Sequence, residues 1–176
     1  MVTASSAALR KDSYALRWYG LAVVLILLDQ YTKGLASNAL EYGRPVLVFP
    51  WLNLTLQHNT GAAFSFLSNA GGWQRYFLSV LALAISVALI VRLYTVSRGQ
   101  WLFALSLSLI LAGALGNVWD RLALGYVVDF ISVHYSGHYF PAFNLADSAI
   151  SVGAACLLLD SFITRDDAGH GEGFDR

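Results

Sequence analysis

The chain has 176 residues, of which 57% are hydrophobic and only 12% are charged. Soluble domains carry about 25% charged residues, so this composition predicts a membrane protein, and the length suits one compact domain. The 11 basic and 11 acidic residues give a net charge of zero without a basic tract, which argues against a nucleic-acid partner. The single cysteine, Cys156, excludes an internal disulfide and a multi-cysteine metal site.

Four stretches are apolar enough to cross a bilayer, which requires about 20 mostly apolar residues. They lie at about 17–36, 75–93, 100–120 and 144–164. The first has a basic flank that also fits a signal peptide, but its polar residues and the three spans that follow favour a retained helix. In the fourth, only 12 uncharged residues separate Asp147 from Asp160. The two acids therefore lie near opposite faces of the membrane, or Asp147 lies inside it.

The placement of lysine and arginine predicts the orientation, because cytoplasmic segments carry an excess of both. Seven of these residues fall on the side of the chain ends and four on the other side, which predicts cytoplasmic N- and C-termini. The segments 38–72 and 122–143 are then extracytoplasmic. We expect a cytoplasmic tail at 1–15, a single domain at 16–165 and a disordered cytoplasmic tail at 166–176.

The two extracytoplasmic segments do not have the composition of ordinary loops. VLVFPWLNLTLQHN (46–59) and GYVVDFISVHYSGHYF (125–140) are rich in β-branched and aromatic residues, which predicts strands. Aromatic residues such as Trp51 and Tyr126 suit the headgroup layer of a membrane. We therefore predict a small β platform on the outer membrane surface.

Two aspartates, Asp129 in YVVDFI and Asp147 in FNLADSAI, lie in or against apolar sequence on the predicted outer side. An ionisable group there is energetically unfavourable, which makes each a candidate functional residue. Each also has a purely structural interpretation. Asn144 and Asp147 have the spacing of a capping box, and Asp129 fits an exposed strand face. As a pair they suit acid/base chemistry, because two carboxylates in one site share a proton.

The segment GALGNVWDR places Asn117 and Arg121 four residues apart, on one face of a helix. Gly113 and Gly116 allow a neighbouring helix or a ligand to approach closely. The structural alternative is that the helix ends at the membrane surface, with Asp120 and Arg121 in water. Asn117 lies one turn deeper and still needs partners.

Further polar residues support or compete with this site. Asn59 opens NTGAAFS, a turn pattern whose amide also suits hydrogen bonding to a substrate backbone. Asp29 and Lys33, four residues apart in the first span, predict an ion pair or a polar support for the site. His134 and His138 are four residues apart, but Gly137 and the strand-like sequence around them do not suit the helical arrangement of a metal site, so we expect no metal and no cofactor. No serine has an obvious histidine base, which argues against a serine protease.

Five motifs occur in a fixed order along the four predicted spans. They are DQYTK (29–33), NTGAAFS (59–65), GALGNVWDR (113–121), GYVVDFI (125–131) and FNLADSAIS (143–151). Together they resemble the bacterial lipoprotein signal peptidase family, also called signal peptidase II. The resemblance extends from about residue 17 to residue 163.

The resemblance implies an intramembrane aspartic endopeptidase. It would remove signal peptides from prolipoproteins by cleaving on the N-terminal side of a cysteine that carries a diacylglyceryl group. Asp129 and Asp147 match the catalytic dyad of the family, and Asp29 matches a supporting acid. The residues that match those binding substrate or globomycin-type inhibitors are Asn59, Asn117, Arg121 and Asn144.

The resemblance also implies a fold and a location. The fold would be mainly α, with four transmembrane helices, a small extracytoplasmic β-cradle and a small surface helix. The enzyme would lie among the lipids of the bacterial cytoplasmic (inner) membrane, with its active site toward the periplasmic face. A proton-coupled transporter and a non-enzymatic scaffold are the alternatives. The acids cluster at one face beside β-rich segments, which favours surface chemistry.

Overall fold

The computed structural model describes the backbone of residues 3–61 and 71–170, with side chains at 14–61 and 71–164. The elements follow in the order α1 (Thr3–Ala39), β1 (Val46–Phe49), β2 (Leu52–Asn59), α2 (Trp73–Tyr94), α3 (Trp101–Ala123), β3 (Val127–Tyr135), β4 (His138–Tyr139) and α4 (Leu145–His170). Both segments predicted to form strands do so. A small surface helix is not among these described elements, and the last four residues of NTGAAFS lie outside the described residues.

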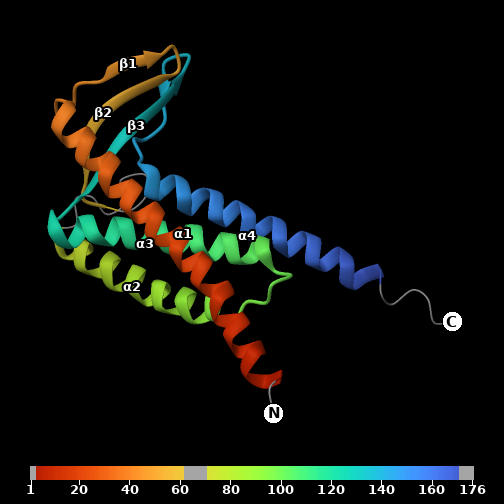
Figure 1. The fold of residues 1–176 in the computed structure, drawn as a ribbon. Helices are drawn as coiled ribbons and strands as arrows, with labels where there is room; N and C mark the ends of the chain where they lie inside the picture. The colour runs from red at the N-terminus through yellow and green to blue at the C-terminus, as the bar shows by residue number, and fades with distance from the viewer. Residues whose placement is uncertain (1–2, 62–70, 171–176) are drawn as a thin grey trace.

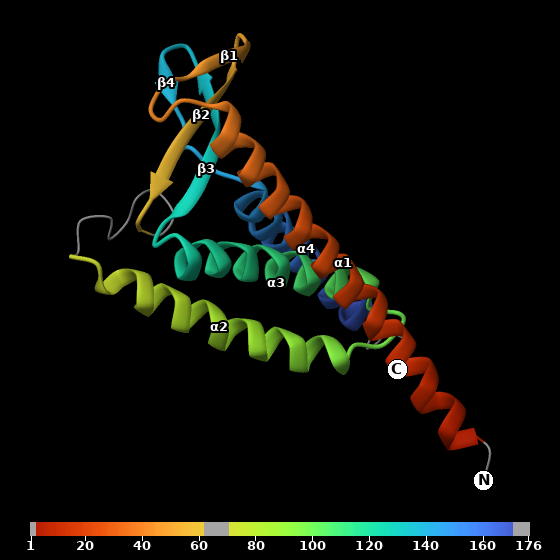
Figure 2. The ribbon, with the colours of Figure 1, turned by 60° about the vertical axis from the view of Figure 1, so that its left-hand side comes forward.

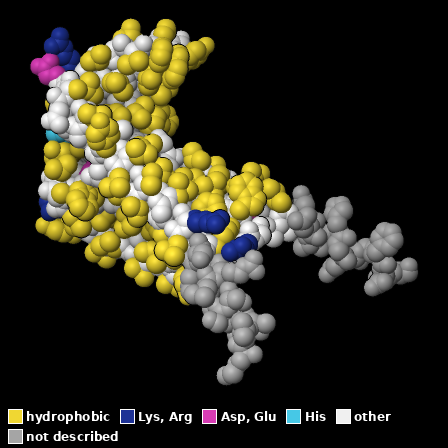
Figure 3. Space-filling model, viewed as in Figure 1, with side chains coloured by type: hydrophobic (Ala, Val, Ile, Leu, Met, Phe, Trp, Pro, Cys, Tyr) yellow, Lys and Arg dark blue, Asp and Glu magenta, His cyan; other side chains and the backbone are white. Residues whose placement is uncertain are grey.

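Three helices in the described part of the chain are long and apolar enough to cross a membrane: α2, α3 and Leu145–Thr164 of α4. Large apolar side chains such as Phe77, Val80 and Val91 are exposed along α2. Hydrophobic side chains cover much of the helical surface in Figure 3. This apolar exterior suits contact with lipid rather than water. α1 is not among the three, since its sequence includes Asp29 and Lys33, and the fourth span stays a prediction.

α3 is the central helix and packs against α1, α2 and α4. Most of its buried residues are small or aliphatic, which lets the neighbouring helices approach closely. One core cluster joins α2 to α3 through Leu93, Val96, Ala104 and Leu107. A second joins α1 to α3 through Ala22, Leu111 and Ala112.

The sheet is antiparallel, with the strand order β1-β2-β3-β4. It stands at one end of the helices, and both chain ends lie at the other end (Figures 1 and 2). The pairing of β2 with β3 shifts in register between Leu54 and Gln57. Such a bulge changes which side chains share a face of the sheet.

Two connections fix the sheet onto the helices. Gly125, with φ of +90°, turns the chain from the end of α3 into β3, a conformation that favours glycine. Ahead of α4, Phe143 forms an antiparallel bridge with Ile131 of β3. The carbonyl oxygen of Phe143 accepts hydrogen bonds from the amides of Phe130 and Ile131. The start of α4 is therefore attached to the middle of β3.

The helices at the two chain ends are longer than the predicted spans. α1 begins at Thr3, and α4 continues to His170, into the segment expected to be a disordered tail. The sequence near the start of α1 is rich in alanine, leucine, arginine and lysine, which are strong helix formers. Local helix propensity explains why the helix continues beyond the apolar stretch at this end.

Candidate active site

Asp129 and Asp147 belong to the two elements that the Phe143 bridge joins. Asp129 lies on β3 and is only 2% exposed. Asp147 lies in the first turn of α4 and is half-buried. The two aspartates that the sequence singled out are thus brought to the same place, where the sheet meets the helices.

Asn144 is fully buried and contacts both aspartates. Its side-chain Nδ2 donates to Asp129 Oδ1 at 2.7 Å. Its backbone N–H donates to Asp147 Oδ2 at 3.3 Å, and its Oδ1 accepts from the backbone N–H of Asp147 at 2.9 Å. The last two bonds are a capping box, so that structural prediction is confirmed. One residue therefore starts the helix and also orients both carboxylates.

Asn117 supports Asp147 from the neighbouring helix. Its Nδ2 donates to Asp147 Oδ1 at 2.8 Å, and its Oδ1 accepts from Lys33 Nζ at 3.0 Å and from Asn144 Nδ2 at 3.4 Å. The ammonium group of Lys33 can only donate, so it fixes which end of the Asn117 amide faces the aspartate. Asn117 and Asn144 therefore hold the carboxylates by direct hydrogen bonds.

A buried ionic cluster lies behind these amides. Lys33 Nζ is 2.7 Å from Asp29 Oδ2 and 3.0 Å from Asp120 Oδ2, and all three side chains are at most 3% exposed. The predicted ion pair of Asp29 and Lys33 is confirmed. Asp29 also accepts from the backbone N–H of Ala146 at 2.8 Å, which ties α1 to the first turn of α4. Three buried charges are tolerated together because each has partners.

The interpretation of Asp120 as a water-exposed helix end is wrong. Asp120 accepts from Gln30 Nε2 at 2.9 Å and from the backbone N–H of Val128 at 3.1 Å, in addition to its contact with Lys33. The turn at Gly125 brings the start of β3 over the end of α3, which keeps water away from this carboxylate. The sequence gives no signal for this burial. Lys33 and Asp120 are far apart along the chain and come together only when α1 packs against α3.

The two glycines of α3 are positions of close approach, as predicted. A Cβ on Gly116 would lie 2.7 Å from Asp29 Oδ2. A Cβ on Gly113 would collide with the backbone oxygen of Ala146 and would lie 2.6 Å from Ile150 Cγ1. The absence of these side chains lets α1 and α4 pack directly on α3, and so brings the polar residues of the three helices together.

Asn59 and Arg121 lie at the open side of the aspartates. Asn59 Nδ2 donates to Asp129 Oδ2 at 3.1 Å, and its Oδ1 accepts from the backbone N–H of Gly61 at 2.9 Å. Arg121 donates to the carbonyl oxygen of Gly61 at 2.9 Å. The Nε of Arg121 is buried and has no partner among the described residues. Arg121 also lines a cavity beside Asp147, so its guanidinium faces a space that a ligand can occupy.

Two cavities meet at the aspartates. One, of about 630 Å³, lies among α2, α3, α4 and the segment before α4. Its walls are mostly apolar, and its polar residues are Asn59, Asn117, Arg121, Asp147, Ser148 and Ser151. The other, of about 330 Å³, lies on the sheet and includes Asp129 and Asn59. An apolar chamber and a polar chamber thus adjoin the same pair of carboxylates.

The surroundings of Asp129 favour its protonated form. Burial, and next the negative charge of Asp147, raise the pKa of Asp129 from 3.8 to about 7, although hydrogen bonds donated by Asn59 and Asn144 act in the opposite direction. A carboxyl group that titrates near neutral pH beside a second carboxylate can both release and accept a proton. The site can therefore perform acid/base chemistry.

His134 and His58 each stack on a tyrosine ring. His134 stacks on Tyr139 in the β3–β4 hairpin, with 5.0 Å between the ring centroids. His58 stacks on Tyr126 at 3.9 Å. Within the described residues, no three potential ligands among His, Cys, Asp and Glu converge in a way that suits a metal ion.

Comparison with known proteins agrees with this architecture. The family model described as signal peptidase (SPase) II matches residues 21–163. A lipoprotein signal peptidase of Teredinibacter turnerae is 52% identical over 158 residues, which cover 90% of this chain and 94% of that protein. One of Acinetobacter baumannii is 55% identical over 145 residues, with 82% of each chain covered.

The fold also matches solved structures. A structure described as a bacterial membrane enzyme has a TM-score of 0.77 and 30% sequence identity, with 91% of this chain and 94% of that chain covered. A second one of the same description has a TM-score of 0.70 and 33% identity, over 81% and 90% of the two chains. Given its apolar helices and these similarities, the chain belongs to the lipoprotein signal peptidase (signal peptidase II) family of membrane proteases, which remove signal peptides from prolipoproteins.

Proposed function

We propose that this chain is an aspartic endopeptidase that cleaves diacylglyceryl-modified prolipoproteins on the N-terminal side of the lipidated cysteine. The observation that carries the proposal is the pairing of Asp129 and Asp147 through Asn144, which contacts both carboxylates. The family supplies the substrate class, and the pair supplies the chemistry.

In the proposed mechanism, the pair holds one proton. The ionised aspartate removes a proton from water, and the resulting hydroxide attacks the scissile carbonyl carbon. The protonated aspartate donates a hydrogen bond to the carbonyl oxygen. As the tetrahedral intermediate collapses, the carbon–nitrogen bond breaks and a proton passes from the pair to the leaving amine. The raised pKa of Asp129 supports a singly protonated pair near neutral pH.

The neighbouring residues divide into two proposed roles. Asn117 and Asn144 position the carboxylates, because their amides bond directly to them. Asn59 and Arg121 face the cavities and would bind the substrate backbone and developing negative charge. Asp29, Lys33, Gly113 and Gly116 would support the site through packing and ion pairing.

The membrane setting is also part of the proposal. α1 would be the fourth transmembrane helix, since it packs along α3 with Asp29 and Lys33 buried against the other helices. The sheet and the aspartates would lie at the periplasmic face of the cytoplasmic (inner) membrane, with both termini in the cytoplasm. The apolar cavity is large enough to receive acyl chains or apolar residues of the signal peptide, and the same cavity would bind globomycin-type inhibitors.

The decisive test is the separate replacement of each aspartate. Asp129→Asn and Asp147→Asn should each reduce cleavage of a purified diacylglyceryl-modified prolipoprotein by at least about a thousandfold. Each variant lacks one of the two carboxyl groups that accept the proton of water and donate to the scissile carbonyl. Asp160→Asn, more than three helical turns along α4 from Asp147, is the matched control and should retain activity. Near-normal cleavage by either active-site variant would refute the dyad. Loss of wild-type activity in a chelator, restored by added metal, would contradict a metal-independent mechanism.

A further inference from the structure

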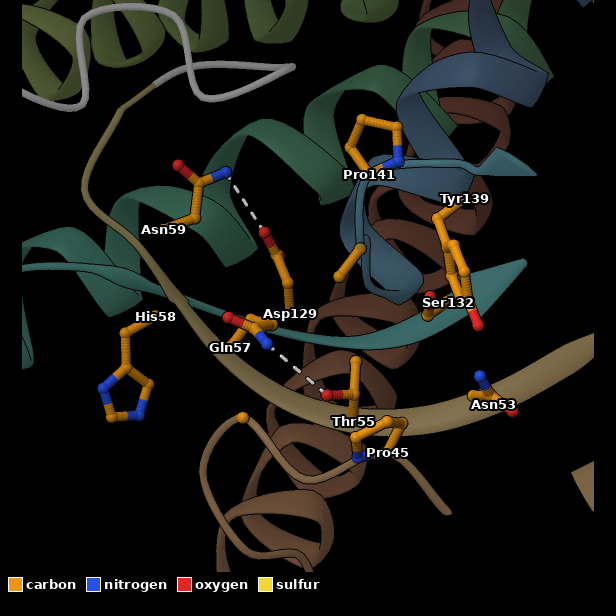
Figure 4. A pocket seen from close by; sticks show the side chains of 12 residues that line it. Pro45, Asn53, Thr55, Gln57, His58, Asn59, Asp129, Ser132, Tyr139 and Pro141 are labelled. Atoms are coloured by element: carbon orange, nitrogen blue, oxygen red, sulfur yellow. Dashed lines mark hydrogen bonds between the residues drawn. The ribbon is translucent and has the colours of Figure 1, made fainter. Parts of the chain in front are cut away.

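The smaller cavity, on the sheet, lies beside Asp129, and most of its polar lining residues are not used by the dyad. Figure 4 shows its lining residues, and its volume is about 330 Å³. Polar side chains at every second position of β2 line it: Asn53, Thr55, Gln57 and Asn59. Ser132 of β3 pairs with Asn53, and Asp129 pairs with Gln57. The register of β2 against β3 shifts between these two pairs, and Asp129 and Ser132, three positions apart on β3, both line the cavity.

Two of these polar side chains are buried without a partner. Asn53 is 6% exposed and Ser132 is 8% exposed. Neither side chain makes a hydrogen bond within the described residues. Thr55 has only a long bond from Gln57, at 3.5 Å. The polar atoms of Asn53 and Ser132 are not among the buried, unpartnered atoms of the described residues, so they stay accessible from the cavity that both side chains line. An accessible amide and hydroxyl without internal partners suit a ligand that donates and accepts hydrogen bonds.

The charge of the cavity restricts the class of ligand. Among the described residues that line it, Asp129 is the one carboxylate, at the end shared with the dyad, and there is no lysine or arginine. His58 is the other titratable group with a shifted pKa, and partial burial lowers the pKa of its imidazole below 6.5, which favours the neutral form at pH 7. The remaining polar lining is neutral. A phosphate or another anion therefore finds no counter-charge, whereas neutral amide groups are well matched.

The spacing of the row matches an extended polypeptide. Side chains at alternate strand positions are about 6.7 Å apart, which is also the repeat of an extended chain. From Gln57 to Asn53 the row extends over about 13 Å, enough for about four residues in extended conformation. β2 is paired on both sides, with β1 and β3, so a ligand cannot add as another strand at its edge. It would lie across the face and bond to the side chains.

We infer that this row, with Asn53 and Ser132 at its outer end, is a binding subsite for the backbone of about four residues that follow the lipidated cysteine in the substrate. The inference rests on the proposed function. The apolar cavity beside Asp147 suits the parts of the substrate that stay in lipid. The polar cavity leads from Asp129 onto the sheet and suits the segment that enters water. Recognition of backbone amides allows many different mature sequences to bind.

The test uses lipopeptides that share one signal peptide and one diacylglyceryl-cysteine. The short substrate ends at the cysteine as an amide, and the long substrate continues for four residues. A third carries the same four residues with methylated backbone nitrogens. The full-length enzyme should have a value of kcat/KM about tenfold higher for the long substrate than for the short one, because two additional hydrogen bonds form. Methylation should remove this preference.

The variants assign the preference to the cavity. In Asn53→Ala combined with Ser132→Ala, the ratio of kcat/KM between long and short substrates should fall to about one, because both hydrogen bonds of the row are lost. Asn38→Ala is the matched control, since Asn38 is exposed near the end of α1 and is not part of the cavity. It should keep the wild-type ratio. Equal cleavage of both substrates by the wild type would overturn this inference alone. Cleavage of neither would overturn the proposed function and this subsite with it.

A binding measurement gives a second readout. Ser132→Cys in a background of Cys156→Ser and Asp147→Asn places a single thiol in the cavity of an enzyme that does not turn over. The long lipopeptide should slow maleimide labelling of this thiol by about tenfold, and the short one should not. Equal protection by both lipopeptides, or by neither, would contradict the subsite.

Discussion

At the scale of single residues, the site depends on a few buried side chains that each have several partners. Lys33 contacts Asp29, Asp120 and Asn117, so one ammonium group links the ionic cluster to the amide that holds Asp147. Removing a partner from such a cluster leaves a buried charge uncompensated, which destabilises a protein by about 3–5 kcal/mol.

Lys33→Met should therefore strongly lower the thermal stability of the protein in detergent. Two carboxylates would remain buried without their cation, and Asn117 would lose the contact that orients its amide. The control is Arg44→Met, because Arg44 and Glu41 form an ion pair that is mostly exposed. Exposed pairs contribute little, so the control should melt at the wild-type temperature. Equal melting temperatures for the two variants would show that the cluster does not stabilise the fold.

The raised pKa of Asp129 predicts a dependence of stability on pH. Between about pH 4 and 7, the folded chain holds a proton on Asp129 that the unfolded chain has released. Stability should therefore fall as pH rises through this window and stay at its lower value above pH 7, with an effect on the order of a few kcal/mol. Asp129→Asn lacks the titrating group. Its melting temperature should fall less than that of the wild type between pH 5 and pH 8, and parallel curves would contradict the shift.

At the scale of elements, α3 is the helix on which the others pack, and its glycines set the distance to α1 and α4. Gly113→Ala should push α4 away, since its Cβ would meet the backbone of Ala146 and the side chain of Ile150. Overpacking of this kind costs about 1–3 kcal/mol and should also displace Asp147. Gly34→Ala is the control, because nothing lies within 4 Å of its Cβ position. Thermal melting and peptidase activity should both fall for Gly113→Ala and not for Gly34→Ala.

The elements themselves were largely predictable from the sequence. The four helical stretches and both strand-forming segments have clear apolar and β-branched patterns, and the spacing of Asn144 and Asp147 indicates a capping box. The tertiary partners were not predictable. Asp120 looked like a water-exposed helix end because its partners, Lys33, Gln30 and the amide of Val128, come from elements that only packing brings together. The register shift between β2 and β3 likewise has no signature in the strand sequences.

At the scale of the whole molecule, both chain ends lie at the opposite end of the helices from the sheet (Figure 1). This arrangement suits a membrane protein whose chemistry takes place at one face only. The excess of lysine and arginine near the chain ends predicts that this end lies in the cytoplasm.

A reporter fused after residue 70, between the sheet and α2, should therefore read as extracytoplasmic in a bacterial host. A reporter fused after residue 99, between α2 and α3, is the matched fusion at the opposite end and should read as cytoplasmic. A cytoplasmic signal from the first fusion would overturn the proposed orientation and the location of the site together.

The double role of Asn144 limits how the enzyme can evolve. The same side chain begins α4 and holds the aspartate on β3, so a mutation there changes helix initiation and acid/base geometry at once. Adaptation to new substrates, or escape from an inhibitor, has little freedom at this position. Variation is instead expected in the walls of the apolar cavity. Side chains such as Ile85 and Val152 line it and take no part in the hydrogen bonds that hold the aspartates.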